Sequence, residues 1–331
     1  MAGVSLSIVI PVFNDASHLP ATIEGVVAAL DGTHFDAELI VVDDGSTDGS
    51  ADAAWASADR VPLRVLTQPN RGRFEARRAG LAAASHEFVL FLDARVRLAG
   101  DALRFVEERV RRGDRVWNGH VEVAAENTFG LFWRLLAELA WRDYFDDPRT
   151  TSFGVADFDR FPKGSGCLLA PRALLEAAFA TFETRYADVR MANDDARILR
   201  ALAAQQPIAI SPRFACVYSP RTNAWRFIRH ALHRGVVFVD GHGTPESRFF
   251  PFVVAFFPLS ALAAVASLRR PFIAPAVLAA CGVGAAALGI RAGRSRREVE
   301  ALAIATPLYA LGHGLGMWRG LAEIVRARLR R

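Results

Sequence analysis

Charged side chains stand where buried strands of this sequence are predicted to end. The run "FVLFLDARV" (88–96) is apolar up to Asp93, and Arg95 follows two residues later. An earlier run, "AELIVVD" (37–43), ends in Asp43, which can accept hydrogen bonds from a base N–H group or from ribose hydroxyls. The strand ends are therefore the candidate binding region, and the pairing of a carboxylate with a guanidinium at one of them needs an explanation.

The first hundred residues alternate between strand and helix patterns. The predicted strands are 6–12, 37–43, 63–67 and 87–93, and the predicted helices are 18–30, 49–58 and 73–84. Continuously apolar strands separated by helices indicate an α/β fold, with a mostly parallel sheet flanked by helices on both faces. Ligands of such sheets bind beyond the carboxyl ends of the strands, which singles out Pro11 to Asp15, Asp43 to Asp48 and Asp93 to Arg95.

The last third of the chain has the composition of a membrane domain. Residues 249–268 and 271–290 carry no charge, 301–318 are similar, and each segment is long enough to cross a bilayer. Residues 248–331 hold twelve arginines against three glutamates, and a basic tail between apolar segments indicates membrane lipids rather than nucleic acid as the partner. We therefore expect a catalytic domain over 1–240 and a membrane domain over 241–331 with two to three hydrophobic helices and a basic C-terminal tail.

The orientation of these segments follows from the distribution of arginine. No secretory signal precedes the first predicted strand, so we expect a multi-pass protein of the cell membrane with its catalytic domain in the cytoplasm. The basic segment "RAGRSRRE" (291–298) then lies inside after two crossings, as the positive-inside rule prefers. A third crossing would place "RARLRR" (326–331) outside, against that rule. Two crossings and three crossings both remain open.

Four pieces of sequence occur in order at the predicted strand–helix junctions: "IPVFND" (10–15), "VDDGSTDGS" (42–50), "NRGRFEARRAGL" (70–81) and "FLDARV" (91–96). Over roughly residues 5–235 the chain resembles the inverting family 2 glycosyltransferases, whose catalytic domain has the nucleotide-diphosphosugar transferase fold called GT-A. The resemblance implies a nucleotide-binding half over 1–115 and an acceptor half over 116–240. It also implies a nucleotide-sugar as donor, and the membrane segments suggest a lipid-linked or glycan molecule as acceptor.

The resemblance assigns the residues that bind the nucleotide-sugar. It places the nucleotide against the backbone of Pro11 and Val12 and against the side chains of Asn14 and Asp15, although Asp15 stands where a glutamate is common. Asp43 corresponds to the aspartate that reads the base. Arg71 and Arg77 lie in the segment that approaches the nucleotide and its pyrophosphate; a solvated, arginine-rich helix face would explain Arg77 equally well.

The stretch "FLDARV" departs from the family pattern. The family carries D-x-D here, and its two carboxylates hold a divalent cation against the diphosphate, whereas this chain has Arg95 in place of the second acid. Asp93 alone is a poor site for Mg²⁺ or Mn²⁺, and Arg95 would repel a cation. A guanidinium can itself neutralise a departing diphosphate. We therefore hypothesise that Arg95, together with Arg97, takes over part of the cation's role, while Asp93 binds sugar hydroxyls or a weakly held metal.

The acceptor side resembles the family in two places. The loop of Lys163, Gly164, Ser165 and Gly166 corresponds to the one that lines the acceptor and sugar pocket, and "ANDDARILRAL" (192–202) lies where the family has the aspartate that takes the proton from the attacking hydroxyl. Asp194 and Asp195 both fit that role. The Q-x-x-R-W signature of processive enzymes is absent from the corresponding region, "NAWRFIRHALHRGVVF" (223–238).

Three functions are compatible with these features. The first is a membrane-anchored inverting glycosyltransferase that moves a sugar from a nucleotide-sugar to a hydroxyl of a lipid-linked or cell-envelope glycan acceptor. The second keeps the fold and makes the acceptor a polyprenyl phosphate, which needs no base because it is already anionic. The third is an inactive membrane scaffold with a degenerate D-x-D motif.

Overall fold

The structure is a computed structural model and describes residues 4–56 and 61–329. The chain divides into two compact units, each built from separate stretches of sequence. Unit 1 consists of Met1–Glu122, Trp141–Glu183 and Asp194–Ser219, and unit 2 consists of Val123–Ala140, Thr184–Asn193 and Pro220–Arg331. The expected division by function, at residue 240, stays a prediction.

Unit 1 holds the alternating strands and helices predicted from the sequence. Its strands are β1 (Ser5–Val12), β2 (Asp36–Asp43), β3 (Leu63–Thr67), β4 (Phe88–Leu92), β5 (Val96–Leu98), β6 (Trp117–Val123), β7 (Thr151–Phe153), β8 (Cys167–Pro171) and β9 (Ile208–Tyr218). Its helices are α1 (Leu19–Leu30), α2 (Ser50–Trp55), α3 (Arg73–Ala83), α4 (Ala102–Arg111), α6 (Arg142–Phe145), α7 (Arg172–Ala180) and α8 (Asp194–Gln205), with a 3₁₀ turn, η2 (Phe158–Arg160). The four predicted strands and three predicted helices are confirmed, except that 57–58 of the second helix lie outside the described residues.

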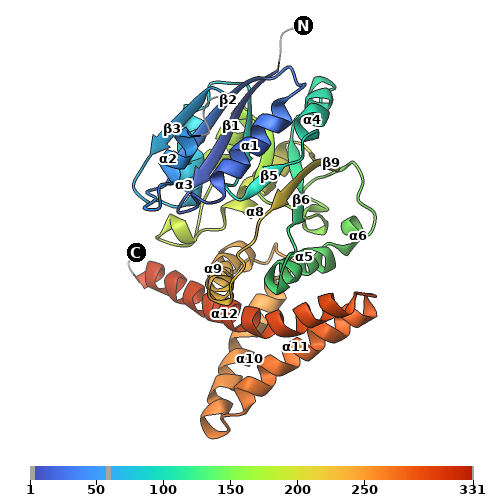
Figure 1. Cartoon of the computed structure of the whole chain (residues 1–331). Helices are drawn as coiled ribbons and strands as arrows, with labels where there is room; N and C mark the ends of the chain where they lie inside the picture. Colours follow the sequence, from blue (N-terminus) through green and yellow to red (C-terminus); the bar gives the residue numbers. More distant parts are fainter. Residues whose placement is uncertain (1–3, 57–60, 330–331) are drawn as a thin grey trace. The chain divides into compact units, whose positions relative to one another are not determined.

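Nine strands of the described residues form one mixed sheet in the order β3-β2-β1-β4-β8-β6-β9-β5, with β7 beside β9. The strands β3, β2 and β1 are parallel (Figure 1). The strand β4 is parallel to β1, whereas β8 runs antiparallel to β4. Because the parallel strands point the same way, the residues that follow β1, β2 and β4 emerge at one edge of the sheet. This arrangement brings together the loops that the sequence analysis singled out.

Successive strand residues point to opposite faces of the sheet. Because these strands are apolar at nearly every position, both faces are hydrophobic, and helices cover both. In β1, Leu6, Ile8 and Ile10 are fully buried in one core cluster with residues of α1, α2 and α4. Val9 points to the other face, where α3 packs so closely that Gly80 lies against its side chain. The expected mostly parallel α/β architecture is confirmed.

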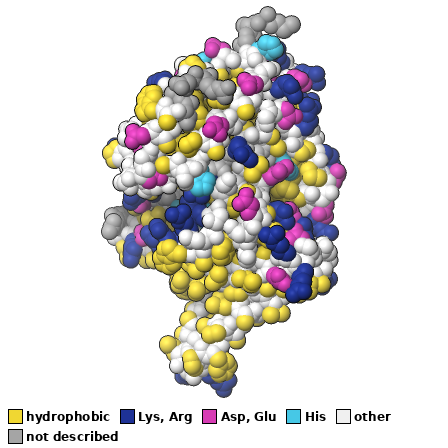
Figure 2. Space-filling model, viewed as in Figure 1, with side chains coloured by type: hydrophobic (Ala, Val, Ile, Leu, Met, Phe, Trp, Pro, Cys, Tyr) yellow, Lys and Arg dark blue, Asp and Glu magenta, His cyan; other side chains and the backbone are white. Residues whose placement is uncertain are grey.

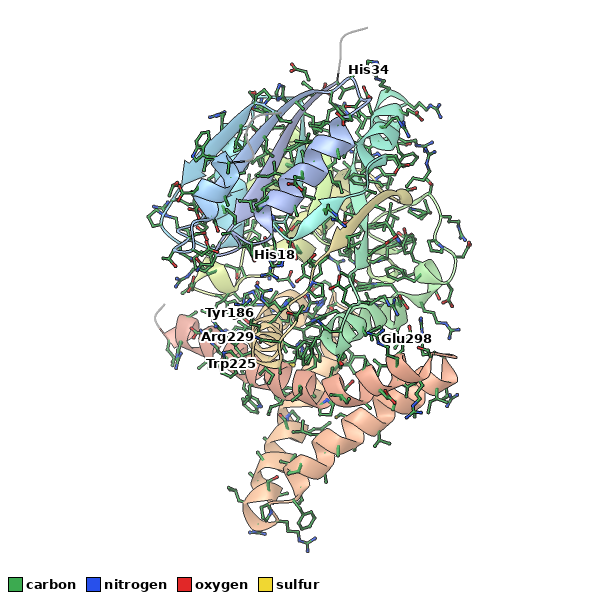
Figure 3. All side chains as sticks on the ribbon, in the orientation of Figure 1. His18, His34, Tyr186, Trp225, Arg229 and Glu298 are labelled. Atoms are coloured by element: carbon green, nitrogen blue, oxygen red, sulfur yellow. The ribbon has the colours of Figure 1, made fainter. Side chains whose placement is uncertain are left out.

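Unit 2 is helical. It contains α5 (Thr128–Ala140), a 3₁₀ turn η3 (Val189–Met191), α9 (Ala224–His242), α10 (Phe250–Arg269), α11 (Ile273–Arg291) and α12 (Arg296–Leu329). The long helix α12 packs along α9, α5 and α11, and Phe132, Phe227 and Leu302 form part of a buried cluster among them. Trp225 and Arg229, one turn apart on α9, are exposed within this unit (Figure 3).

Two helices of the described residues are long and apolar enough to cross a membrane, α10 and α11, which correspond to the predicted segments 249–268 and 271–290. Only 6% and 11% of their most apolar stretches are buried, so their side chains have no protein core to fill. Figure 2 shows hydrophobic side chains over this part of the surface, with basic side chains at the tip. Composition and exposure together suit both helices to lipid.

The third predicted segment, 301–318, lies within α12 and has a different environment. Ala301, Leu302, Ala305 and Met317 are buried against the other helices of unit 2. This part of α12 therefore uses much of its apolar surface in contacts with protein.

Gly80 offers a test of the packing between α3 and β1. A Cβ atom at this position would lie 2.2 Å from Cγ1 of Val9, so a branched side chain must displace the helix or the strand. We expect Gly80→Val to destabilise unit 1 by about 1–3 kcal/mol or more, which lowers the melting temperature by several degrees. Tryptophan fluorescence of the detergent-solubilised full chain measures it. Gly100→Val is the matched control, because a Cβ atom on Gly100 would meet nothing within 4 Å; an equal shift in both variants would contradict the packing.

Candidate active site

The loops that follow β1 and β2 are held together by side chains of both. Asn14 has a positive φ of 50°, and its Oδ1 accepts a hydrogen bond from the backbone N of Thr47 at 2.8 Å. In return, Ser46 Oγ accepts from the backbone N of Asn14, at 2.9 Å, and Ser50 Oγ accepts from the backbone N of Asp15, at 3.1 Å. The two predicted nucleotide-binding loops thus form one ordered surface at the sheet edge.

The two aspartates at the end of β2 have different partners. Asp43 is buried, and its Oδ1 accepts a hydrogen bond from the backbone N of Ser46, which closes the turn after the strand. Asp44 accepts hydrogen bonds from Nε2 of Gln68 at 2.7 Å and from the backbone N atoms of Arg71 and Gly72, each at 2.8 Å. Asp44 therefore fixes the loop that leads into α3, a role that the sequence analysis did not identify. The backbone of Val12 lies beside this turn, since its carbonyl accepts from the N of Asp44.

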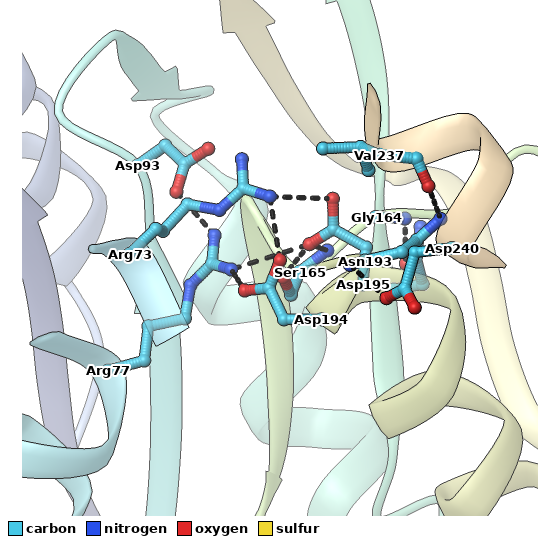
Figure 4. Close-up of polar contacts among 11 residues, drawn as sticks. Arg73, Arg77, Asp93, Gly164, Ser165, Asn193, Asp194, Asp195, Val237 and Asp240 are labelled. Atoms are coloured by element: carbon cyan, nitrogen blue, oxygen red, sulfur yellow. Dashed lines mark hydrogen bonds and ion pairs between the residues drawn. The ribbon is translucent and has the colours of Figure 1, made fainter. Parts of the chain in front are cut away.

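Three aspartates converge on two arginines of α3 (Figure 4). Nη2 of Arg77 is 2.6 Å from Oδ1 of Asp93, and its Nη1 is 2.7 Å from Oδ2 of Asp194 and 3.3 Å from Oδ1 of Asp195. Nη2 of Arg73 is 2.7 Å from Oδ1 of Asp194 and 3.4 Å from Oδ2 of Asp195. The end of β4, the first turn of α8 and one face of α3 thus meet in a single ionic cluster, which we call the arginine–aspartate cluster.

The loop before β8 completes this cluster. Ser165 donates a hydrogen bond through its Oγ to Oδ1 of Asp195, and its backbone N lies 3.3 Å from the same oxygen. The next residue, Gly166, accepts a hydrogen bond from the backbone N of Asp93 at 2.9 Å. A Cβ atom on Gly166 would come within 2.9 Å of Oδ2 of Asp93, so only glycine fits this close approach without a shift.

Burial and charge differ strongly within the cluster. The side chain of Arg77 is fully buried and that of Asp194 is 3% exposed, whereas those of Arg73 and Asp195 are 40% and 36% exposed. Burial alone would raise the pKa of Asp195, but the charges of Arg73 and Arg77 and the hydrogen bonds from Ser165 hold it well below the ordinary value. The charges of Asp194 and Asp195 raise the pKa of Arg73. The carboxylate of Asp195 is therefore ionised at neutral pH.

Arg95 takes part in a separate ion pair. Its guanidinium contacts both carboxylate oxygens of Asp15, with Nε at 3.0 Å from Oδ2, and its Nη1 lies 3.4 Å from Nε2 of His18. Among the described residues, every hydrogen bond or ion pair of this guanidinium goes to Asp15 or His18. The structure thus joins Arg95 to the loop after β1 and gives Arg77, not Arg95, as the cation beside Asp93.

The remaining predicted acceptor residues point to different partners. Lys163 donates from Nζ to the carbonyl of Phe161, and the same atom lies 4.4 Å from the ring centre of Phe158 and 3.9 Å from Asp159. The backbone N of Gly164 donates to Oδ1 of Asn118 at 3.1 Å. Of the four loop residues, Ser165 and Gly166 are the ones that contact the cluster.

The donor set fits a divalent cation poorly. No group of three or more His, Cys, Asp or Glu side chains in the described part of the chain could hold a metal ion together. The carboxylate of Asp93 already bonds the guanidinium of Arg77, which a cation would have to displace or repel. No step of the chemistry below is therefore assigned to a metal.

The sequence analysis named Arg77, Asp93, Asp194 and Asp195 of this cluster, but not Arg73. The signal was present, because Arg73 and Arg77 are four residues apart on a predicted helix and must lie on one face. The alternative of a solvated helix face for Arg77 does not describe its environment, since the side chain is completely buried.

Comparison with known proteins finds a family match over residues 7–161. Residues 7–161 match the glycosyl transferase family 2 model. An uncharacterized glycosyltransferase from Nostoc sp. is 41% identical over 91 residues, which is 27% of each chain. The undecaprenyl-phosphate 4-deoxy-4-formamido-L-arabinose transferase of Serratia proteamaculans is 40% identical over 92 residues, 27% of this chain and 28% of that protein. These matches thus span little more than a quarter of the relatives' length.

Solved structures share the fold at low sequence identity. The S. aureus protein TarS in complex with UDP superposes with a TM-score of 0.54 at 15% identity, over 99% of this chain and 92% of that one. The mannosyltransferase PcManGT from Pyrobaculum calidifontis, in complex with GDP-Man and Mn²⁺, gives a TM-score of 0.50 at 19% identity over 98% and 86%. The chain therefore contains a glycosyl transferase family 2 domain of GT-A fold over residues 7–161, followed later in the sequence by two apolar helices suited to a membrane.

Proposed function

We propose that the protein is a membrane-anchored inverting glycosyltransferase that uses a nucleotide-sugar donor and a lipid-linked or cell-envelope glycan acceptor. The observation that supports it best is the arginine–aspartate cluster, in which Asp93 at the end of β4 and Asp195 at the start of α8 share Arg77. A leaving diphosphate needs positive charge and an attacking hydroxyl needs a base, and the cluster offers both in one place. A transfer assay tests the proposal: membranes that contain the chain should move label from a UDP-, GDP- or dTDP-sugar to an acceptor.

The proposed reaction is a single displacement. The acceptor hydroxyl attacks the anomeric carbon, Asp195 takes its proton, and the nucleoside diphosphate leaves from the opposite face of the sugar. We assign the base to Asp195 rather than Asp194 because its carboxylate is 36% exposed and lies 3.3 and 3.4 Å from the two arginines, whereas that of Asp194 is 3% exposed and lies 2.7 Å from each of them. Asp194 would then hold Arg73 and Arg77 in place. Asp43 and the loop of Asn14 would bind the nucleoside.

A second candidate acceptor is a polyprenyl phosphate. The support comes from the relatives named undecaprenyl-phosphate 4-deoxy-4-formamido-L-arabinose transferase, which match this chain over about 92 residues. A phosphate oxygen is already ionised and can attack without a base. The exposure of Arg73 and Asp195 at this cluster supports an enzyme rather than the inactive scaffold, because a purely structural ion-pair network has no need of exposed members.

The proposed location is the cytoplasmic face of the cell membrane, with α10 and α11 as two crossings. The link between them carries Arg269 and Arg270, whereas the segment after α11 carries four arginines within 291–297, which the positive-inside rule places in the cytoplasm. The exposed Trp225 and Arg229 of α9 are residue types that suit contact with lipid headgroups.

The base assignment can be tested by substitution. With a hydroxyl acceptor, Asp195→Asn should lower the turnover number about 100-fold or more, since general base catalysis contributes about 10²–10⁴. The melting temperature should fall less than in Asp194→Asn, because the carboxylate of Asp194 is buried and lies closer to both arginines; Asp194→Asn should also lower the turnover number. Glu176→Gln, exposed on α7, is the control. A loss below tenfold for Asp195→Asn would reject the hydroxyl mechanism and favour the polyprenyl phosphate acceptor.

The acid side of the pH profile gives an independent check. Because the charges of Arg73 and Arg77 and the hydrogen bonds from Ser165 outweigh the partial desolvation of Asp195 and lower its pKa, the ionised base should persist as the pH falls. We therefore expect kcat/KM to stay level from pH 7 to pH 5, since this parameter reports ionisations of the free enzyme. A limb centred near pH 6 in the wild type would contradict the assignment.

Membrane topology can be read from two fusion sites. With two crossings, a green fluorescent protein fused after residue 331 should fluoresce and an alkaline phosphatase there should be inactive. A phosphatase inserted after Arg270, between α10 and α11, should be active. Phosphatase activity at the C-terminus would instead indicate three crossings, with α12 as the third.

A further inference from the structure

Arg73 has unused hydrogen-bonding capacity at the edge of the cluster. Its contacts with Asp194 and Asp195 are all made through one nitrogen, Nη2, and its side chain is 40% exposed. A guanidinium carries five N–H donors, and the described residues give those on Nη1 and Nε of Arg73 no hydrogen-bond partner. Arg73 can therefore donate hydrogen bonds to an anionic ligand while it stays bonded to the carboxylates of Asp194 and Asp195.

Arg77 has the opposite character. Its side chain is fully buried, and its two terminal nitrogens are engaged by Asp93, Asp194 and Asp195. It is a fixed positive charge at the one carboxylate of the altered D-x-D motif. A divalent cation at Asp93 would share one carboxylate with the guanidinium of Arg77, which lies 2.6 Å from its Oδ1, and Coulomb repulsion opposes this.

The other arginines of this edge are less suitable. Arg95 is 11% exposed and is already paired with Asp15. Arg71 contributes its backbone N to Asp44, and the structure gives no contact that would position its exposed side chain. Arg73 combines a fixed position, exposure and free donors.

We propose that Arg73 binds the diphosphate of the donor directly, and that Arg73 and Arg77 together replace the divalent cation that a complete D-x-D motif would hold. The proposal rests on the proposed function, since it assumes a nucleoside diphosphate as the leaving group. Arginine forms bidentate contacts with phosphate oxygens, so the replacement also fixes the direction from which the diphosphate is held. Binding and turnover then do not require added metal.

The test is binding of nucleoside diphosphates to the purified full chain in detergent. UDP, GDP and dTDP are titrated by calorimetry, once with EDTA and once with Mn²⁺. We expect one of the three to bind with dissociation constants that agree within about threefold in the two conditions. For that nucleotide, Arg73→Gln should weaken binding in EDTA about 10- to 100-fold, the usual magnitude for lost hydrogen bonds to a charged group.

Two further variants make the result specific. Arg73→Lys keeps the charge without the planar fork and should restore part of the lost affinity. Arg78→Gln is the matched control on the same helix, because Arg78 is 59% exposed and pairs with Glu75 on the surface. Its affinity should equal that of the wild type. Melting curves without ligand show whether each variant is folded.

The outcomes separate this inference from the proposed function. Binding that appears only with Mn²⁺ and is lost in EDTA would overturn the replacement of the cation while leaving the glycosyltransferase proposal intact. Equal affinity of Arg73→Gln and wild type in EDTA would exclude Arg73 as the diphosphate ligand. Failure of all three nucleotides in both conditions would reject the proposed function and this inference with it.

Discussion

The buried guanidinium of Arg77 is the interaction on which the site depends. It joins the end of β4 to the first turn of α8, two segments about a hundred residues apart in sequence, through contacts of 2.6 and 2.7 Å. A buried charge is tolerated only when it is paired. Removing one partner of such a pair lowers the free energy of unfolding by about 3–5 kcal/mol. The three carboxylates around Arg77 therefore have a structural reason to be ordered before any ligand arrives.

The position of Arg77 is itself fixed by the strand ends. Asp44 secures the backbone of Arg71 and Gly72, and α3 begins at the next residue. Gly80, one turn after Arg77, lets the helix lie directly on Val9 of β1. The position of the charge thus follows from local features: a carboxylate after β2, a glycine where the helix meets the sheet, and the helical repeat that carries Arg73 and Arg77 to one face.

Sequence patterns predicted the elements better than the contacts between them. Apolar runs and helical spacing located β1 to β4 and α1 to α3 within a few residues, because burial on both faces leaves an unambiguous pattern. The partner of Arg95 could not be read this way, since Asp15 is eighty residues away and its direction depends on how the loop after β1 turns. Likewise, 301–318 resembles the two exposed apolar helices in composition, and packing against α9 and α5 distinguishes it only in three dimensions.

Neighbouring carboxylates at the start of α8 illustrate how one helix end can supply two roles. Asp194 and Asp195 both lie in the first turn of the helix, where the helix dipole is favourable to acidic side chains in general. The helical rotation between consecutive residues sends Asp194 inward to both arginines and leaves Asp195 at the surface beside Ser165. Environment rather than residue type then separates an ordering carboxylate from one that an acceptor can reach. The same logic applies to Arg77 and Arg73 on α3, so the site surrounds an inner, buried ion pair with an outer guanidinium and an outer carboxylate that stay exposed.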